Sequence, residues 1–395
     1  MPSSRLSRFT LLPELELQGM FKESKHRVIF KVTKVSEFEV CPKCASKSHR
    51  VYDHREAKVK DAPLRGRKVT LVIRKRRFEC SNCRSVFTEP VPGISKGKRF
   101  TQRFKSHVLW ACEKFTDLKA VKRHVGCSYG FLYNALYEQL ELNRRKTAHE
   151  QWPRVIGIDE HSFKKNKVYR HMEFVTMLVD HRNKRTIDMV HGRSGPNLKA
   201  SLHHIPKRSN VNWVTMDLSQ TFRKFSKDFF PKAQIVADKF HVVRLLDHHV
   251  NRHRKTITGD QRKNPIRKLL LKNEINLDYP TKSVIHKWLS FHPDLKEIYF
   301  LKQALHRLYR TKGYKKASKA FTNLTDRMGK SKLKEVITLR KTLLSWRQEI
   351  LNYFKTRLTN ARVEGFNNKA KLIKRRAYGY KSFKNYRLRV LNACC

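Results

Sequence analysis

The sequence predicts a multidomain α+β protein in which a zinc ribbon and a helix-turn-helix precede an α/β core, and an all-helical insertion interrupts that core. Three observations predict this fold class. Two C-x-x-C pairs lie among strand-like segments, a helix–Gly–helix pattern follows them, and alternating strands and helices then lead into a long run of helical periodicity. A chain of 395 residues is long enough for about two to four domains.

The chain carries an excess of positive charge that predicts a polyanionic partner. Lys and Arg number 88 and Asp and Glu 33, so the formal net charge is +55, and the basic residues are spread along most of the chain. Self-repulsion at this charge is unfavourable unless a polyanion neutralises it, so nucleic acid is the expected partner. Charge alone does not separate a DNA enzyme from a regulator or a ribosome-binding protein.

No segment has the length and apolar character of a membrane-spanning helix, so no membrane contact is expected. Residues 1–20 lack an apolar stretch followed by a cleavage site, which predicts a cytoplasmic protein. Four of the eight cysteines fall in the two C-x-x-C pairs, and this usage indicates a metal site rather than disulfides.

The first predicted module is the zinc ribbon. A strand is expected at residues 28–40, just before Cys41 and Cys44, and a second strand in "RKVTLVIRKRRFEC" leads to Cys80 and Cys83. Two thiolate pairs on opposing turns can close a tetrahedral site for structural Zn²⁺. The gap between the pairs exceeds the common spacing, and a long hairpin between the turns would absorb it. Coincidentally buried thiols are the alternative.

The second module is a predicted helix-turn-helix within residues 101–142. A short helix stops at Gly126, and Ser128 is a suitable N-cap for a recognition helix over residues 129–140. An ordinary helical hairpin is the alternative. If the helix reads DNA, its candidate contact residues are Tyr129, Tyr133 and Asn134.

From Pro153 the pattern becomes β-β-β-α-β-α-β, an antiparallel meander followed by two crossover units. This is the order of the ribonuclease-H-like fold. The five strands are expected at residues 154–160, 169–180, 186–192, 210–217 and 233–238.

Residues 244–352 have an amphipathic helical pattern and are very basic. A further helix is expected in "NARVEGFNNKAKLIKRR", with Val363, Phe366, Ala370 and Ile373 as its buried stripe. The predicted division is an N-terminal extension (1–38), the zinc ribbon (39–92), the helix-turn-helix (98–147), a first core part (152–243), the insertion (244–352) and a second core part (353–395).

Three acidic residues are the candidate catalytic centre. In the predicted sheet the first strand lies beside the fourth, so Asp159 and Asp217 should meet at one edge, and a helix covering that edge could add Glu364. Carboxylates crowded together repel unless cations lie between them, and oxygen ligands suit two Mg²⁺ or Mn²⁺ ions. The alternative is that each acid is a solvated surface group or a turn residue. Asp238 is the main rival to Asp217.

Around Glu364 the last helix is strongly basic, and its cations would hold a DNA backbone near the ions. These predicted DNA-binding residues are Arg362, Lys369, Lys371, Lys374, Arg375 and Arg376.

The ordered set "GIDEHSFKK", "VTMDLSQTF", "FPKAQIVADKFHVVR" and "TNARVEGFNNKAKLIKRRAYGY", together with "CPKC" and "CSNC", resembles the ISL3 family of bacterial insertion-sequence transposases of the DDE type. The resemblance covers nearly the whole chain. It implies a catalytic triad of Asp159, Asp217 and Glu364, Mg²⁺-dependent nicking at element ends, and transfer of the 3′-hydroxyl to target DNA. "DKFH" is similar to a D-x-x-H signature that implies a place near the catalytic centre for His241; a buried core histidine is the alternative.

The resemblance also implies double-stranded DNA as partner. The zinc ribbon and helix-turn-helix would bind the terminal inverted repeats, and pairing of two ends implies a homodimer or larger assembly in the bacterial nucleoid. The rival hypotheses are a non-catalytic DNA-binding regulator, such as a domesticated relative, and an RNA- or ribosome-binding protein. The intact set of three acids argues against the first, and the absence of a base-stacking platform in the sequence pattern argues against the second.

Overall fold

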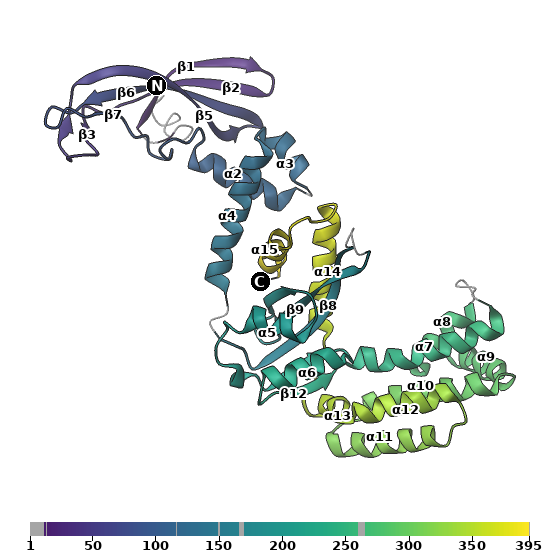
Figure 1. Ribbon diagram of the computed structural model, residues 1–395. Helices are drawn as coiled ribbons and strands as arrows, with labels where there is room; N and C mark the ends of the chain where they lie inside the picture. The colour runs from purple at the N-terminus through teal and green to yellow at the C-terminus, as the bar shows by residue number, and fades with distance from the viewer. Residues whose placement is uncertain are drawn as a thin grey trace. The chain divides into compact units, whose positions relative to one another are not determined.

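The computed structural model describes residues 12, 14–115, 117–148, 151–165, 170–259 and 265–394. The chain divides into two compact units, residues 1–142 and 143–395 (Figure 1). Among the described residues, no helix combines the length and the apolar character needed to cross a bilayer.

A five-stranded sheet forms the first part of the N-terminal unit. Its path is β1 (Leu15–Ser24), β2 (Arg27–Lys34), β6 (Arg67–Glu79) and β5 (Val51–Leu64), and the short β7 (Val86–Thr88) also pairs with β6. Strands β1 and β2 lie in the segment predicted as an N-terminal extension, and β2 joins the sheet by parallel pairing with β6. Alternate apolar residues of β2 and β6 build the core: Val28, Phe30, Val32, Val69, Leu71 and Ile73.

Strands β5 and β6 form the long hairpin expected between the two cysteine pairs. Arg65 and Gly66 connect them, with φ of 47° and 76°. Positive φ at both central residues is what a two-residue hairpin turn requires, and glycine adopts it without steric cost. The hairpin therefore separates the two pairs along the chain while its open end keeps them close in space.

Three helices follow: α2 (Gln102–Lys114), α3 (Leu118–Val125) and α4 (Tyr129–Thr147). Gly126 ends α3 in the left-handed conformation, with φ of 72°, and the Ser128 hydroxyl accepts a hydrogen bond from the Phe131 amide at 3.2 Å. Both features match the stop and the cap expected from the sequence. A separate apolar core joins the helices, including Phe104, Val108, Val121, Leu132 and Leu136.

The second unit is built on a five-stranded sheet in the order β10-β9-β8-β11-β12. All five strands expected from the sequence are present: β8 (Val155–Lys165), β9 (Met172–Asp180), β10 (Arg185–His191), β11 (Trp213–Met216) and β12 (Gln234–Ala237). Strand β11 is parallel to both β8 and β12, whereas β9 is antiparallel to β8 and β10.

Helices cover both faces of this sheet (Figure 1). On one face lie α5 (Gly195–Leu202) and α6 (Gln220–Phe229), which pack on Ile156 and Ile158 of β8. On the other face lie α14 (Ala361–Arg376) and α15 (Phe383–Ala393), which pack on Phe163 of the same strand. Because side chains alternate along a strand, β8 presents its odd-numbered residues from 157 to 163 to α14 and α15.

The helical pattern of the segment after β12 is confirmed. Its described residues form seven α-helices, beginning a few residues before the predicted start, and they share a large apolar core. They are α7 (Lys239–Thr258), α8 (Pro265–Leu271), α9 (Tyr279–Ser290), α10 (Pro293–Arg310), α11 (Tyr314–Gly329), α12 (Lys334–Ser345) and α13 (Arg347–Thr356). Helix α13 returns to the sheet, where the Asn352 side chain donates to the Ile235 carbonyl at 2.9 Å.

Candidate metal centre and active site

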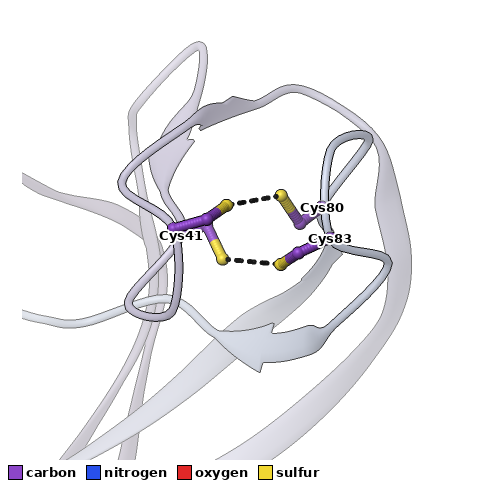
Figure 2. A group of neighbouring side chains, drawn as sticks. Cys41, Cys80 and Cys83 are labelled. Atoms are coloured by element: carbon purple, nitrogen blue, oxygen red, sulfur yellow. Dashed lines mark hydrogen bonds between the residues drawn. The ribbon is translucent and has the colours of Figure 1, made fainter.

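The four cysteines of the two C-x-x-C pairs come together as predicted. Sγ of Cys41 lies 3.6 Å from Sγ of Cys83, Sγ of Cys44 lies 3.5 Å from Sγ of Cys80, and all four sulfurs lie within 4.8 Å of one another. Figure 2 shows sulfurs of one turn facing those of the other. A tetrahedral ion with Zn–S bonds of 2.3 Å needs sulfurs about 3.8 Å apart, so this donor set fits structural zinc.

The two cysteine turns have the same backbone design. In the first, the Cys41 amide donates to Ser46 O and Cys41 O accepts from the Ala45 amide; in the second, Cys80 makes the equivalent bonds with Ser85 and Arg84. Hydrogen bonds from the Ser46 side chain and backbone lower the pKa of Cys44 to about 6. This favours the thiolate, which is the form that binds metal.

Strand register places Asp159 and Asp217 near each other in the second unit. Gly157 of β8 pairs with Thr215 of β11, and each aspartate follows two residues later, on the same face of the sheet. Burial and the negative charge of Asp217 raise the pKa of Asp159 to about 6. The first strand is predicted to end near Asp159, but β8 continues to Lys165 by pairing with β9 alone.

His241 lies between two carboxylates. Its Nδ1 lies 2.9 Å from Oδ1 of Asp217 and 3.1 Å from Oδ2 of Asp238, and these three residues form a group whose ligand atoms lie within 4.8 Å. Burial alone would lower the pKa of His241, but its hydrogen bonds to Asp217 and Asp238 raise it to about 10. The imidazolium therefore neutralises part of the negative charge that the aspartates concentrate here.

Both carboxylate oxygens of Asp238 accept hydrogen bonds from backbone amides. Its Oδ2 accepts from the Phe240 and His241 amides at the start of α7, its Oδ1 accepts from the Asn360 amide at 2.8 Å, and the residue is buried. Burial raises its pKa, but the hydrogen bonds from His241 and Asn360 outweigh burial and hold the pKa below its ordinary value. Asp217 is the more open of the two rivals, which favours it as the carboxylate that faces a ligand.

Glu364 lies in the first turn of α14, and its side chain is exposed. Within the described ranges, it does not belong to a group of ligand atoms lying within 4.8 Å. Asn367, one turn further along the same side of the helix, donates from Nδ2 to Oδ2 of Asp159 at 2.7 Å. The structure thus places Asp159 and Asp217 on neighbouring strands, close enough to interact electrostatically, and sets the Glu364 helix against Asp159. Among the described residues, Asp159, like Glu364, lies outside the group formed by Asp217, Asp238 and His241.

Asn360 fixes the start of α14 to the sheet. Its Nδ2 donates to Ile158 O at 3.1 Å, and its Oδ1 accepts from the Thr215 hydroxyl at 2.8 Å. Its backbone N–H also donates a hydrogen bond to Asp238. This buried residue therefore contacts β8, β11 and the residue that follows β12. Asn360 is not among the residues predicted from the sequence, although a polar residue directly before a basic amphipathic helix is a visible signal.

The predicted DNA contacts differ in their surroundings. On α4, Tyr129, Tyr133 and Asn134 are exposed. On α14, Lys371, Arg375 and Arg376 are exposed, whereas Lys374 donates to the carbonyls of Ser162 and Phe163 and so holds the helix to β8. Arg362 is half-buried, and Lys369 donates to Ala393 O.

Comparison with known proteins gives three matches. Residues 156–390 match the model of a transposase family, the DDE transposases of ISL3 type. A zinc-finger family of the transposases of IS204, IS1001, IS1096 and IS1165 matches residues 37–83. The chain is also 24% identical over 365 residues to the transposase for insertion sequence element IS1001 of Bordetella parapertussis, across 89% of this chain and 87% of that protein.

Proposed function

Since the chain belongs to the ISL3 family of insertion-sequence transposases, we propose that it binds the terminal inverted repeats of its element and cleaves and transfers DNA strands through Asp159, Asp217 and Glu364. One observation carries this proposal. Asp159 and Asp217 occupy equivalent positions on neighbouring parallel strands, close enough for the charge of Asp217 to raise the pKa of Asp159. Such a pair is unfavourable unless a cation neutralises it.

The sheet supports a ribonuclease-H-like core. Its antiparallel meander, its two parallel crossover strands and its helices on both faces are what that fold requires. Glu364 approaches this core from α14, after the helical segment α7–α13. The exposed carboxylate of Glu364 would join the two aspartates when metal and DNA bind.

The donor set fits Mg²⁺ or Mn²⁺. Asp159 and Asp217 supply carboxylate oxygens, which these hard cations prefer, and Glu364 would complete the set. Bound ions would lower the pKa of an attacking water or 3′-hydroxyl and stabilise the leaving oxygen. The role of the chain itself is to hold the carboxylates in register and to bring the phosphate backbone close with Lys371, Arg375 and Arg376.

The N-terminal unit is proposed to recognise the inverted repeats. The zinc ribbon would supply a rigid basic module, and α3 and α4 would act as a helix-turn-helix with Tyr129, Tyr133 and Asn134 towards base edges. Pairing of two element ends then implies a homodimer or larger assembly on double-stranded DNA in the nucleoid. Matching terminal repeats on both sides of the gene would support this proposal independently.

The test is Asp159→Asn, which removes a charge but keeps the shape of the side chain. We expect loss of Mg²⁺-dependent cleavage by 10³-fold or more, on the order of a lost metal ligand, with the dissociation constant for inverted-repeat DNA unchanged within about twofold. The matched control is Asp326→Asn, an exposed aspartate on α11, which should cleave as wild type does. Cleavage by Asp159→Asn at the wild-type rate would disprove the assignment.

The alternative is a non-catalytic DNA-binding regulator. It predicts specific binding by the wild-type protein with no Mg²⁺- or Mn²⁺-dependent cleavage, and no difference between wild type and Asp159→Asn in any assay. The same two proteins and the same DNA therefore separate the two functions.

A further inference from the structure

A chain of three buried side chains ends on Asp159. The Tyr386 hydroxyl lies 2.8 Å from His161 Nε2, His161 Nδ1 lies 2.8 Å from Asn367 Oδ1, and Asn367 Nδ2 donates to Asp159 Oδ2 at 2.7 Å. The three residues come from α15, β8 and α14, and their exposed fractions are 0%, 3% and 2%. Bulk water is therefore excluded from a path that leads to the proposed active site.

The chemistry of these groups fixes the direction of each hydrogen bond. An ionised carboxylate only accepts, so the amide NH₂ of Asn367 faces Asp159 and its Oδ1 faces His161. His161 Nδ1 must then carry a proton, and in a neutral imidazole Nε2 accepts from the Tyr386 hydroxyl. With Asp159 ionised and the His161 imidazole neutral, only this arrangement satisfies all three hydrogen bonds.

The chain also explains how Asp159 is held. Its Oδ1 accepts from the Glu160 amide at 2.7 Å, and its Oδ2 accepts from Asn367. Each carboxylate oxygen has a second lone pair, so both remain able to bind a cation while the plane of the group is fixed. Partners that orient a metal ligand in this way commonly affect metal affinity or activity by about 10–100-fold.

We propose that Asn367 is a positioning residue that orients the Asp159 carboxylate for a divalent cation, and that His161 and Tyr386 hold the Asn367 amide in the orientation that donates. The inference rests on the proposed role of Asp159 as a ligand. Helix α14 would then serve the metal site twice, because it carries both Glu364 and the Asn367 side chain that orients Asp159.

Mn²⁺ binding to the full chain, followed by electron paramagnetic resonance of the free ion, tests the proposal without relying on activity. Asn367→Leu should weaken Mn²⁺ binding by about 10-fold or more and raise the Mg²⁺ concentration for half-maximal cleavage similarly. The matched control is Asn352→Leu. It removes another buried asparagine of the same unit, whose Nδ2 bonds the Ile235 carbonyl instead. Its Mn²⁺ affinity should stay within about twofold of wild type.

A milder variant covers the case in which Asn367→Leu does not fold. Tyr386→Phe removes only the hydroxyl at the far end and keeps the ring stacked on Phe163. Loss of this bond should weaken Mn²⁺ binding by about two- to fivefold, the equivalent of one hydrogen bond of about 0.5–1 kcal/mol.

Unchanged Mn²⁺ affinity in both Asn367→Leu and Tyr386→Phe, or equal weakening in Asn367→Leu and Asn352→Leu, would overturn the inference. The proposed function is judged separately by Asp159→Asn. If that variant is inactive while Asn367→Leu binds Mn²⁺ as wild type does, only the positioning role fails. If Asp159→Asn cleaves normally, the proposed function fails.

Discussion

Gly157 is the residue that lets α14 approach the sheet. A Cβ atom at this position would lie 2.4 Å from Val363 Cγ2, 2.7 Å from His181 Nε2 and 3.0 Å from Asn360 Oδ1. Real Cβ atoms do not tolerate the first two separations, and two of the three neighbours belong to the start of α14 or its cap. The reason for glycine is therefore space, and the space admits the helix that carries Glu364.

We expect Gly157→Ala to lower the free energy of unfolding by about 1–3 kcal/mol, the usual cost of overpacking, and to reduce strand cleavage because α14 must shift. Chemical denaturation and a cleavage assay measure the two effects. Gly365→Ala is the matched control for stability. Its Cβ would meet nothing within 4 Å, so in a helix it should stabilise the protein by about 0.5–1 kcal/mol. Equal stability of the two variants would contradict the steric argument.

At the residue scale, part of the site could be predicted from the sequence. Asp159 and Asp217 lie on or directly after two strands that the ribonuclease-H-like order makes neighbours, so their proximity could be predicted. His161 and Asn367 were not assigned a role, although the alternation of β8 puts 157, 159 and 161 on one face. The reason is physical: a polar residue within an apolar pattern shows that a partner exists, but only the packed fold shows which one.

At the element scale, the cysteine turns are predicted to depend on zinc. Cys44→Ser should lose the zinc that wild type binds, at about one ion per chain, and lower the thermal stability of the N-terminal sheet, because binding free energy of a structural site is folding free energy. Metal analysis and thermal unfolding of the full chain measure both. Cys127→Ala is the control, since Cys127 is buried in the apolar core of the helices α2–α4. Equal zinc content in wild type and Cys44→Ser would exclude Cys44 as a ligand.

Elements with strong local signals were predicted well. The strands β8–β12 and the Gly126 stop follow from apolar runs, turns and caps, which depend on neighbours in sequence. The parallel pairing of β2 with β6 was not predicted, because a parallel pair joins segments far apart along the chain and leaves no short pattern. Cys394, unexplained by the sequence, is buried in the core between α14, α15 and the sheet, and Cys395 lies outside the described residues.

At the scale of the whole molecule, the charge of +55 predicts DNA binding that depends strongly on salt concentration. Each phosphate that a protein neutralises releases counterions, so the logarithm of the binding constant falls with the logarithm of salt concentration by about 0.9 per contact. A high net charge raises the affinity for DNA whichever part of the surface carries it. Only Lys and Arg side chains that contact phosphates contribute to this slope. The slope therefore separates the cations that bind DNA from those that balance charge at a distance.

We expect Lys371, Arg375 and Arg376 on α14 to belong to the first kind, because all three are exposed on the helix that reaches the proposed active site. Changing them together to Ala should reduce the magnitude of the slope by about 2–3 and weaken binding equally for inverted-repeat and unrelated duplexes. Fluorescence anisotropy across a salt series measures both quantities.

The matched control changes three exposed lysines of α11 to Ala: Lys315, Lys316 and Lys319. This triple variant loses the same amount of charge as the α14 variant, but from another helix. If α14 contacts the phosphates and α11 does not, the control lowers affinity slightly through the net charge but leaves the slope unchanged. Equal slopes in both triple variants would mean that the cations of α14 act only through net charge. The basic residues around Glu364 would then have no special part in holding DNA at the carboxylates.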